Sequence, residues 1–276
     1  MDGSVKRQII LENLFGVDLD MQAVEIARLN LLINSLDKKE ALPPLDKNIK
    51  NGNSLKFDWK GEFKEIFKQG GFDVIIGNPP YGAELSKEDQ EYFKKIYAIG
   101  STDTAVLFIK KSIELLKKQG WLGFIVPKAF TFASNYEKIR NLVWDNVQSI
   151  IDCGKAWKEV KLEQIIFILQ KDDIRKVYES GTIDESGIKI IGLIDKNIAK
   201  QFGFFLNDVS EEEIYITEKI LKNSVMLNDI SNNQRGAMLQ KEIGETGELE
   251  VIGGAQISRE GTKGIKGRIN KNNIKD

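Results

Sequence analysis

The sequence contains no histidine and only one cysteine among its 276 residues. Without an imidazole, a Ser-His-Asp triad, histidine-ligated metals and acid–base catalysis by histidine are all excluded. The single cysteine, Cys153, can support neither a disulfide framework nor a cysteine-rich zinc site.

Long apolar runs are also lacking. No window approaches the length that spans a membrane, and the opening MDGSVKRQIILENLFGV does not resemble a signal peptide. We therefore expect a cytoplasmic protein without a membrane partner. Apolar residues make up 41% and charged residues 29% of the chain, so a sizeable core is expected.

An excess of positive charge is missing as well. The formal net charge is −1, which is unusual for a dedicated nucleic-acid binder. Basic residues nevertheless gather between Gln256 and Lys275, where a single acid, Glu260, accompanies Arg259, Lys263, Lys266, Arg268, Lys271 and Lys275. This run is either a solvated surface or a patch that contacts phosphates. Of these residues, we assign Lys263, Lys266 and Arg268 to DNA contact.

Short apolar strands alternate with amphipathic helices over the first two-thirds of the chain. Strands are expected at 14–19, near 49, and at 72–76, 121–126, 147–152 and 164–170, and helices at 22–35, 104–118 and 134–145. This order predicts a doubly wound α/β sheet with functional groups at the carboxyl ends of its strands. The pattern weakens after a boundary near 171–176, leaving a helix at 211–222 and strands at 188–193 and 249–252.

The most informative stretch is FDVIIGNPPYG, residues 72–82. A continuous apolar run, typical of a buried parallel strand, ends at Gly77 and is followed by Asn78, Pro79, Pro80 and Tyr81. An open α/β sheet binds its ligands at this position. A proline-rich turn with a packed tyrosine is the structural alternative, but the strand context favours a functional loop.

The chemistry of adenine explains these four residues. The exocyclic amine of adenine is a poor nucleophile because its lone pair is conjugated with the ring. Asn78 offers a side-chain carbonyl for one amine hydrogen, and the Pro79 backbone carbonyl can accept the other. Pro80 has a fixed φ and no competing N–H. Tyr81 offers a flat face on which a flipped base can stack.

Taken together, these motifs resemble the adenine-N6 DNA methyltransferases whose cofactor motifs come first, especially the fused type IIG restriction–modification enzymes. The resemblance covers roughly residues 6–171 and, more weakly, the rest. It rests on LFGVDLDMQAVEIARLNLLI, IKNGNSL, FDVIIGNPPYG, STDTAVLFIKKSIELLKKQGWLGFIVP and QIIFILQ. It implies a Rossmann-like sheet and methyl transfer from S-adenosyl-L-methionine to adenine N6 of a flipped base in double-stranded DNA.

The resemblance also assigns residues to the cofactor and to the target base. Asp18 would accept hydrogen bonds from the ribose hydroxyls, whereas Asp20 is expected to cap the following helix. Asn53, with Ser54 beside it, matches a position that contacts the cofactor adenine. The family often has aspartate there, and an Asx-turn is the alternative for Asn53. Two aromatic residues complete the set: Phe108 would line the cofactor adenine or belong to the helix core, and Trp157 would close the target-base pocket.

A strand and a glycine-rich loop should precede Asp18 in this family, and residues 1–15 contain no such loop. We therefore expect the first strand of the sheet to be missing and this chain alone to be inactive. An upstream segment or subunit would supply the loop. Residues 1–171 would form an incomplete methyltransferase domain, and residues 172–276 part of an α+β target-recognition region.

Two other interpretations stay open. Methyltransferases that act on a glutamine amide in a protein, or on a base in RNA, also use NPPY, although they normally lack the long segment that follows 121–126 here. A DNA-binding fragment without catalysis is the second, and the missing loop supports it. Cytosine-C5 methylation is disfavoured because Cys153 lies on an apolar strand outside a Pro-Cys setting.

Overall fold

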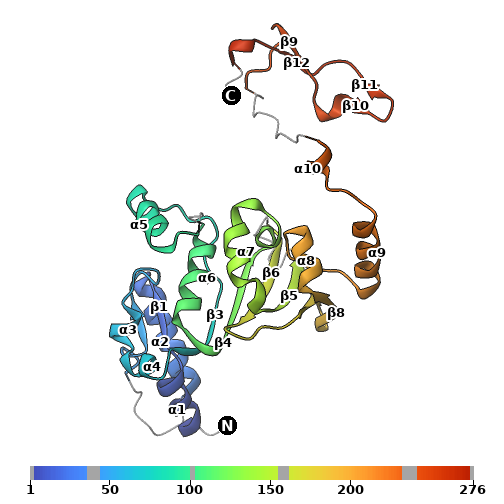
Figure 1. The fold of residues 1–276 in the computed structure, drawn as a ribbon. Helices are drawn as coiled ribbons and strands as arrows, with labels where there is room; N and C mark the ends of the chain where they lie inside the picture. Colours follow the sequence, from blue (N-terminus) through green and yellow to red (C-terminus); the bar gives the residue numbers. More distant parts are fainter. Residues whose placement is uncertain (1–2, 36–43, 100–102, 155–161, 232–240, 274–276) are drawn as a thin grey trace. The chain divides into compact units, whose positions relative to one another are not determined.

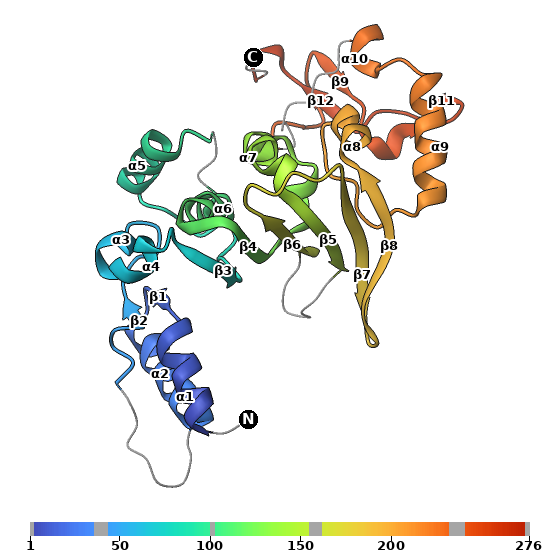
Figure 2. The ribbon, with the colours of Figure 1, turned by 60° about the horizontal axis from the view of Figure 1, so that its bottom comes forward.

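The computed structural model describes residues 3–35, 44–99, 103–154, 162–231 and 241–273. The chain forms two compact units, Met1–Lys219 and Ile220–Asp276. The larger unit contains a mixed six-stranded sheet in the order β3 (Phe72–Gly77), β4 (Leu116–Pro127), β6 (Gln164–Gln170), β5 (Val147–Gly154), β7 (Val177–Asp184) and β8 (Gly187–Asp195). Figure 1 shows the chain from one side, and Figure 2 labels all six strands of this sheet. This arrangement confirms the expected α/β class. Among the described residues, no helix is long and apolar enough to cross a membrane.

A second, smaller sheet lies near the start of the larger unit. Strand β1 (Gly16–Asp18) pairs in parallel with β2 (Ile49–Asn51), and helices α1 (Gly3–Asn13) and α2 (Met21–Ser35) pack beside this pair (Figure 2). Helix α2 begins where it was predicted, because the Asp20 carboxylate accepts the Gln22 N–H at 2.8 Å.

An aromatic cluster connects the β1–β2 pair with the start of β3. Its centre is Phe72, whose ring lies 6.1 Å from that of Phe15 and 5.7 Å from that of Trp59. The short helices α3 (Trp59–Glu62) and α4 (Lys64–Lys68) supply further rings, including Phe63 and Phe67. These edge-to-face contacts bury apolar area between the two sheets.

One face of the six-stranded sheet, here called the covered face, packs against helices α6 (Thr104–Leu115), α7 (Glu137–Val143) and α8 (Lys196–Phe202) (Figure 2). Its residues include Leu122, Ile150 and Phe167, which are all 0% exposed. Alternate residues of the same strands point to this side, as the two-residue period of a strand requires.

The opposite face, here called the bare face, presents Val74, Ile76, Trp121, Ile168, Ile188, Ile190 and Leu193. Val74 is 57% exposed and Ile76 is 80% exposed. The prediction of a parallel strand at 72–76 is confirmed, but the expectation that it is buried is wrong. Among the described residues, no helix covers this face and no strand pairs with the outer edge of β3.

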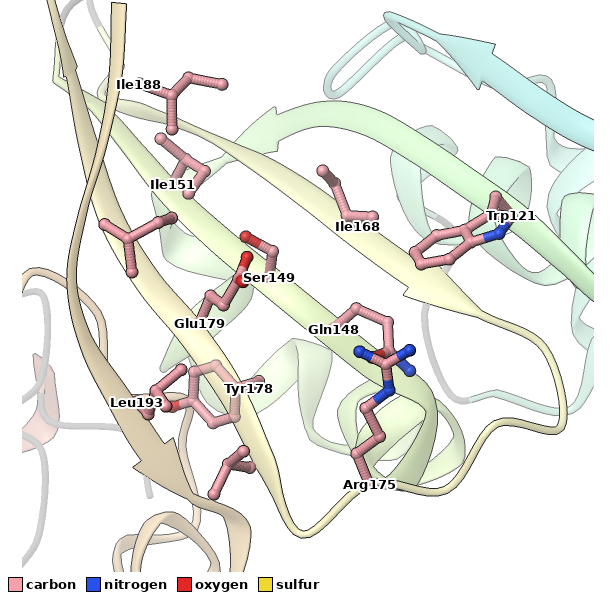
Figure 3. A pocket seen from close by; sticks show the side chains of 12 residues that line it. Trp121, Gln148, Ser149, Ile151, Ile168, Arg175, Tyr178, Glu179, Ile188 and Leu193 are labelled. Atoms are coloured by element: carbon pink, nitrogen blue, oxygen red, sulfur yellow. The ribbon is translucent and has the colours of Figure 1, made fainter.

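The bare face is hollowed over strands β4 to β8. Figure 3 shows this hollow, which has a volume of about 340 Å³ and is lined by Trp121, Ile168 and Ile188 together with polar groups such as Ser149 and Glu179. Residues 78–81 do not line it. This concavity is therefore an uncovered sheet surface, distinct from the predicted catalytic loop.

Helix α6 is shorter than predicted. It ends at Leu115, and the next residues enter β4. The Lys171 ammonium group donates to the carbonyl oxygens of Ile113 at 2.8 Å and Leu116 at 2.6 Å. A cation at this end satisfies helix carbonyls and complements the helix dipole. The predicted helix at 134–145 is also divided, into η2 (Ser134–Tyr136), α7 and η3 (Trp144–Asn146).

Strands β7 and β8 continue the sheet beyond the expected boundary at 171–176. Strand β7 pairs in parallel with β5 and antiparallel with β8. The two compact units divide between Lys219 and Ile220. Helix α9 (Glu211–Lys222) has the predicted bounds.

The smaller unit consists of short elements. Helix α10 (Leu227–Ile230) precedes two small antiparallel pairs, β9 (Leu249–Val251) with β12 (Gly267–Ile269) and β10 (Ile257–Ser258) with β11 (Gly261–Thr262). The strand predicted at 249–252 is thus confirmed as β9.

Candidate active site

The loop Asn78–Tyr81 leaves the sheet at the carboxyl end of β3. The last pair between β3 and β4 joins Gly77 to Phe124, and a Cβ atom on Gly77 would lie 3.2 Å from the Phe124 ring. A glycine therefore suits this close approach. Beyond it, Asn78 is exposed and Pro79 is buried.

The Tyr81 hydroxyl lies 2.7 Å from the Asn78 side-chain oxygen and 3.3 Å from the Ile125 carbonyl. A phenol carries one hydrogen, so the shorter contact to Asn78 is the stronger bond. Burial, with a smaller contribution from Cys153, raises the pKa of Tyr81, and the hydroxyl remains a donor at neutral pH. One lone pair of the Asn78 carbonyl is thus engaged, and the other stays available for a second donor.

Thr104, the first residue of α6, holds the far side of the same loop. Its hydroxyl donates to the Pro80 carbonyl at 2.5 Å and accepts the Ala83 N–H at 3.4 Å. The side chain is only 3% exposed. Sequence reasoning missed this residue, although the polar stretch STDTA ahead of an apolar helix was a visible signal.

The start of α6 is itself anchored. Asp103 accepts the Ala105 N–H at 2.9 Å as the N-cap and the Tyr136 hydroxyl at 2.8 Å. Burial, together with the hydrogen bond to Asp103, raises the pKa of Tyr136 to about 12. Tyr136 therefore remains a donor over the ordinary pH range, and the helix start stays tied to η2.

Asp18, Asn53 and Ser54 come together at the carboxyl ends of β1 and β2. The Ser54 hydroxyl donates to the Val17 carbonyl at 2.7 Å, so it braces the end of β1. Asn53 accepts the Leu55 N–H at 3.0 Å through its side-chain oxygen, which is the Asx-turn that the sequence left open.

The Asp18 carboxylate is exposed at this edge. Its Oδ1 atom accepts the Asp20 N–H at 2.8 Å. Because the group is exposed and each carboxylate oxygen has two lone pairs, it has acceptor capacity for sugar hydroxyls. This edge thus offers an exposed acceptor, which is the kind of group that the expected ribose contact requires.

The remaining predicted residues are more scattered. Phe108 is partly buried and packs against the core beneath the covered face. Trp157 lies outside the described residues. Within the described part of the chain, no hydrogen bond links the Asp18 edge to the Asn78 loop. The two groups of site residues are thus each assembled locally, on separate sheets.

A charged cluster that the sequence did not reveal lies at the carboxyl ends of β4 and β5. The Lys128 ammonium group lies 2.5 Å from the buried Asp152 carboxylate and 3.2 Å from the exposed Glu163 carboxylate. The Asn207 side-chain amide donates to the same Asp152 carboxylate at 3.0 Å. Burial alone would lower the pKa of Lys128, but its bonds to Asp152 and Glu163 raise it, so the lysine stays charged. Strands β3, β4 and β5 run in parallel, which brings this cluster to the same edge as Asn78.

The predicted DNA-contacting residues belong to the smaller unit. Lys263 and Lys266 are exposed, whereas Arg268 pairs with Glu250 across β9 and β12 at 2.5 Å. Arg268 thus has a partner on the neighbouring strand β9, and the two lysines present their charge to solvent.

Comparison with known proteins points in one direction. The profile of the Eco57I restriction-modification methylase family matches residues 12–157. The Type II methyltransferase M.VspI of a Vibrio species is 30% identical over 271 residues, which cover 94% of this chain and 62% of that protein. The Type II restriction enzyme and methyltransferase RM.Eco57I of Escherichia coli is 33% identical over 166 residues, 51% of this chain and 17% of that protein.

Solved structures of the same class share the fold. The DrdV–DNA complex aligns with a TM-score of 0.51 at 19% identity, over 66% of this chain and 22% of that one. The type ISP restriction-modification enzyme LlaBIII bound to DNA aligns with a TM-score of 0.50 at 15% identity, over 68% and 17%. These likenesses support a Rossmann-like methyltransferase fold for the larger unit.

The relatives are longer than this chain, which spans 62% of M.VspI and 17% of RM.Eco57I. The family match nevertheless covers more than half of the 276 residues and includes β1, β2, β3 and the Asn78–Tyr81 loop. This chain therefore belongs to the Eco57I restriction-modification methylase family.

Proposed function

We propose that this chain carries most of the catalytic domain of a DNA adenine-N6 methyltransferase in a restriction–modification system. The observation that carries the proposal is the Asn78 side chain, held by Tyr81 at the carboxyl end of β3, within a chain of this family. An amide oxygen in that setting can accept a hydrogen bond from an amine. The proposed activation of the adenine amine by the Asn-Pro-Pro-Tyr loop requires such an acceptor.

The loop would activate the target amine by accepting its hydrogens. The Asn78 side-chain carbonyl accepts a hydrogen bond from one N–H of the amine, and the Pro79 backbone carbonyl accepts one from the other N–H. These two bonds free the nitrogen lone pair for attack. Tyr81 provides a stacking face for a base flipped out of the duplex, and Trp157 closes the pocket. When bound, S-adenosyl-L-methionine supplies an electrophilic methyl group. Most of the rate comes from positioning and electrostatics.

The cofactor's nucleoside would bind at the β1–β2 edge. Asp18 would accept hydrogen bonds from the ribose hydroxyls, and Asn53, Ser54 and Phe108 are the residues that would hold the adenine. The Asn53 side-chain oxygen is already engaged by the Leu55 N–H, so recognition of the adenine amine draws on its remaining lone pair.

The methionine end of the cofactor needs a glycine-rich loop from residues outside this chain, whether joined to it or on a separate polypeptide. The unpaired outer edge of β3 and the exposed Val74 and Ile76 support this proposal, because a parallel sheet is normally covered on both faces. The chain alone would then be inactive. We propose residues 1–171 as its methyltransferase part and residues 172–276, which also add β7 and β8 to the sheet, as part of the target-recognition region.

Among the alternatives, DNA is favoured over RNA and protein because relatives such as M.VspI are named as type II methyltransferases. Cytosine-C5 methylation is disfavoured by Cys153, since burial raises the pKa of its thiol and so disfavours a thiolate nucleophile. A non-catalytic DNA-binding role predicts no transfer even in a completed enzyme.

The test is methyl transfer from labelled S-adenosyl-L-methionine to unmethylated bacterial DNA. The chain is co-expressed with the part of M.VspI that lies outside the matched region. We expect transfer to adenine N6 in the complex and none with the chain alone. Asn78→Ala should abolish transfer and leave cofactor binding within a few-fold, whereas Tyr81→Phe should retain much of the activity. Full activity in Asn78→Ala would overturn the proposal.

The proposed DNA contacts are tested separately by the salt dependence of binding. Charge reversal at Lys263, Lys266 and Arg268 should weaken binding and lower the slope against salt by about one unit per lost phosphate contact. Arg268→Glu also breaks the pair with Glu250, so Lys263→Glu with Lys266→Glu is the cleaner variant. An unchanged slope would mean that the run is only a solvated surface.

A further inference from the structure

Thr104 is the described side chain that joins both flanks of Tyr81 to a helix. Its hydroxyl bonds the Pro80 carbonyl on one side and the Ala83 N–H on the other, so a single oxygen atom spans the turn at Tyr81 and Gly82. Both bonds start from a residue that is 3% exposed, in the first turn of α6. The Thr104 hydroxyl is therefore held in a buried place, whereas its partners Pro80 and Ala83 belong to an exposed turn.

The turn between these two bonds would otherwise be loose. Gly82 has φ of +59°, in the left-handed region, and a Cβ atom added there would meet nothing within 4 Å. A glycine with open space around it leaves many conformations accessible. The Thr104 hydroxyl removes this freedom at the two points where the turn begins and ends.

We propose that Thr104 is a positioning residue for methyl transfer, acting through the backbone on either side of Tyr81. Its bond to the Pro80 carbonyl fixes the peptide between Pro80 and Tyr81, and this restrains the direction of the Pro79 carbonyl one residue earlier. Its bond to Ala83 limits how far the Tyr81 ring can swing from Asn78. The proposal rests on the function assigned to this loop above.

The same helix connects the loop with the expected cofactor side. Phe108 lies four residues after Thr104, so both side chains fall on one side of α6. The helix start is held in turn by Asp103 and Tyr136. Thr104 thus ties the loop to a fixed element that also carries Phe108.

The first experiment measures amide hydrogen exchange at Tyr81, Gly82 and Ala83 in the full chain. Thr104→Val keeps the shape of the side chain and removes its hydroxyl, whereas Thr104→Ser keeps the hydroxyl. We expect exchange to be about two- to tenfold faster in the valine variant, as for the loss of one hydrogen bond, and nearly unchanged in the serine variant. Equal exchange rates in the wild type and in Thr104→Val would overturn the proposal that the Thr104 hydroxyl holds this turn.

The second experiment measures kcat and KM in the enzyme completed as described above. Thr104→Val should lower kcat about 10- to 100-fold and leave the KM for S-adenosyl-L-methionine within about threefold, because misplacement affects the reacting geometry. Thr104→Ser should recover most of the loss. Ser112→Ala removes another buried hydroxyl from the same helix, and its kcat should stay close to wild type.

The outcomes separate the two proposals. A completed wild-type enzyme that transfers no methyl group would overturn the proposed function, and the exchange experiment would still decide whether Thr104 holds the loop. An equal loss of kcat in Thr104→Val and Ser112→Ala, with matching losses of thermal stability, would overturn the positioning role. Faster exchange together with unchanged kcat would overturn it as well.

Discussion

The two faces of the six-stranded sheet are built from the same strands and differ in what covers them. On the covered face, Leu122 and Phe167 are 0% exposed beneath α6, α7 and α8. On the bare face, Ile76 is 80% exposed and Ile188 is 56% exposed. Both sets are apolar, so hydrophobicity did not decide which side is buried. Burial instead followed the helices that reach the sheet within this chain.

This difference also separates the parts of the candidate site. The Asn78–Tyr81 loop is tied to the covered side through Thr104, Asp103 and Tyr136. The bare face and the outer edge of β3 contribute no such ties among the described residues. Within the part of the chain that the structure describes, the Asn78–Tyr81 loop is therefore held by the covered side of the sheet alone.

The largest expected effect is on the covered face. Phe167→Ala removes a ring that packs 4.9 Å from Phe130, and the loss of burial together with the cavity should lower the free energy of unfolding by about 3–5 kcal/mol. Chemical denaturation followed by circular dichroism measures this change. A loss below about 1 kcal/mol would mean that the covered face is not the main core.

A smaller effect concerns the charge buried under that face. Burial lowers the pKa of Lys196 to about 8 from its ordinary 10.5, against the opposing attraction of Asp145. Between these values the unfolded chain binds more protons than the folded one, so stability should rise with pH. We expect a gain of roughly 1–2 kcal/mol between pH 7.5 and 9.5.

Thermal or chemical unfolding across this pH range provides the measurement. Lys196→Met removes the titrating group and should flatten the rise. Tyr136, with a pKa raised to about 12, stays protonated throughout this window and does not confuse the result. An unchanged slope in Lys196→Met would show that another group is responsible.

The smallest effect is expected on the bare face. Ile188→Ala should change the free energy of unfolding of the chain by less than about 0.5 kcal/mol, because the side chain is already exposed. A loss above about 2 kcal/mol in the chain alone would contradict the comparison of the two faces.

Much of the fold could be predicted from short-range pattern. The strand at 72–76, the loop after it and the bounds of α9 follow from apolar runs and their limits. Strand β7 escaped notice because its sequence VYESGTID has few apolar residues, and a buried serine, Ser180, is 0% exposed within it. The end of α6 depends on Lys171, a residue 55 positions beyond Leu116. Such an end cannot be read from the helix itself.

The candidate site divides in the same way. Asn78 and Asp18 were found because each follows an apolar strand, but the roles proposed for them stay predictions. Thr104 and Lys128 were missed because their partners, Pro80 and Asp152, lie more than twenty positions away along the chain. A hydroxyl or an ammonium group carries no local sign of the partner that it will meet after folding.

The tethering of α6 at both ends has a mechanical consequence. Asp103 and Tyr136 hold its first turn, and Lys171 holds the carbonyls of its last turn. A rod fixed at two points, with a buried face between them, resists both tilting and sliding. Any movement of the Asn78–Tyr81 loop must therefore be absorbed by torsions near Gly82, where the backbone is most permissive. Helix α6 then acts as the stationary wall against which that motion takes place.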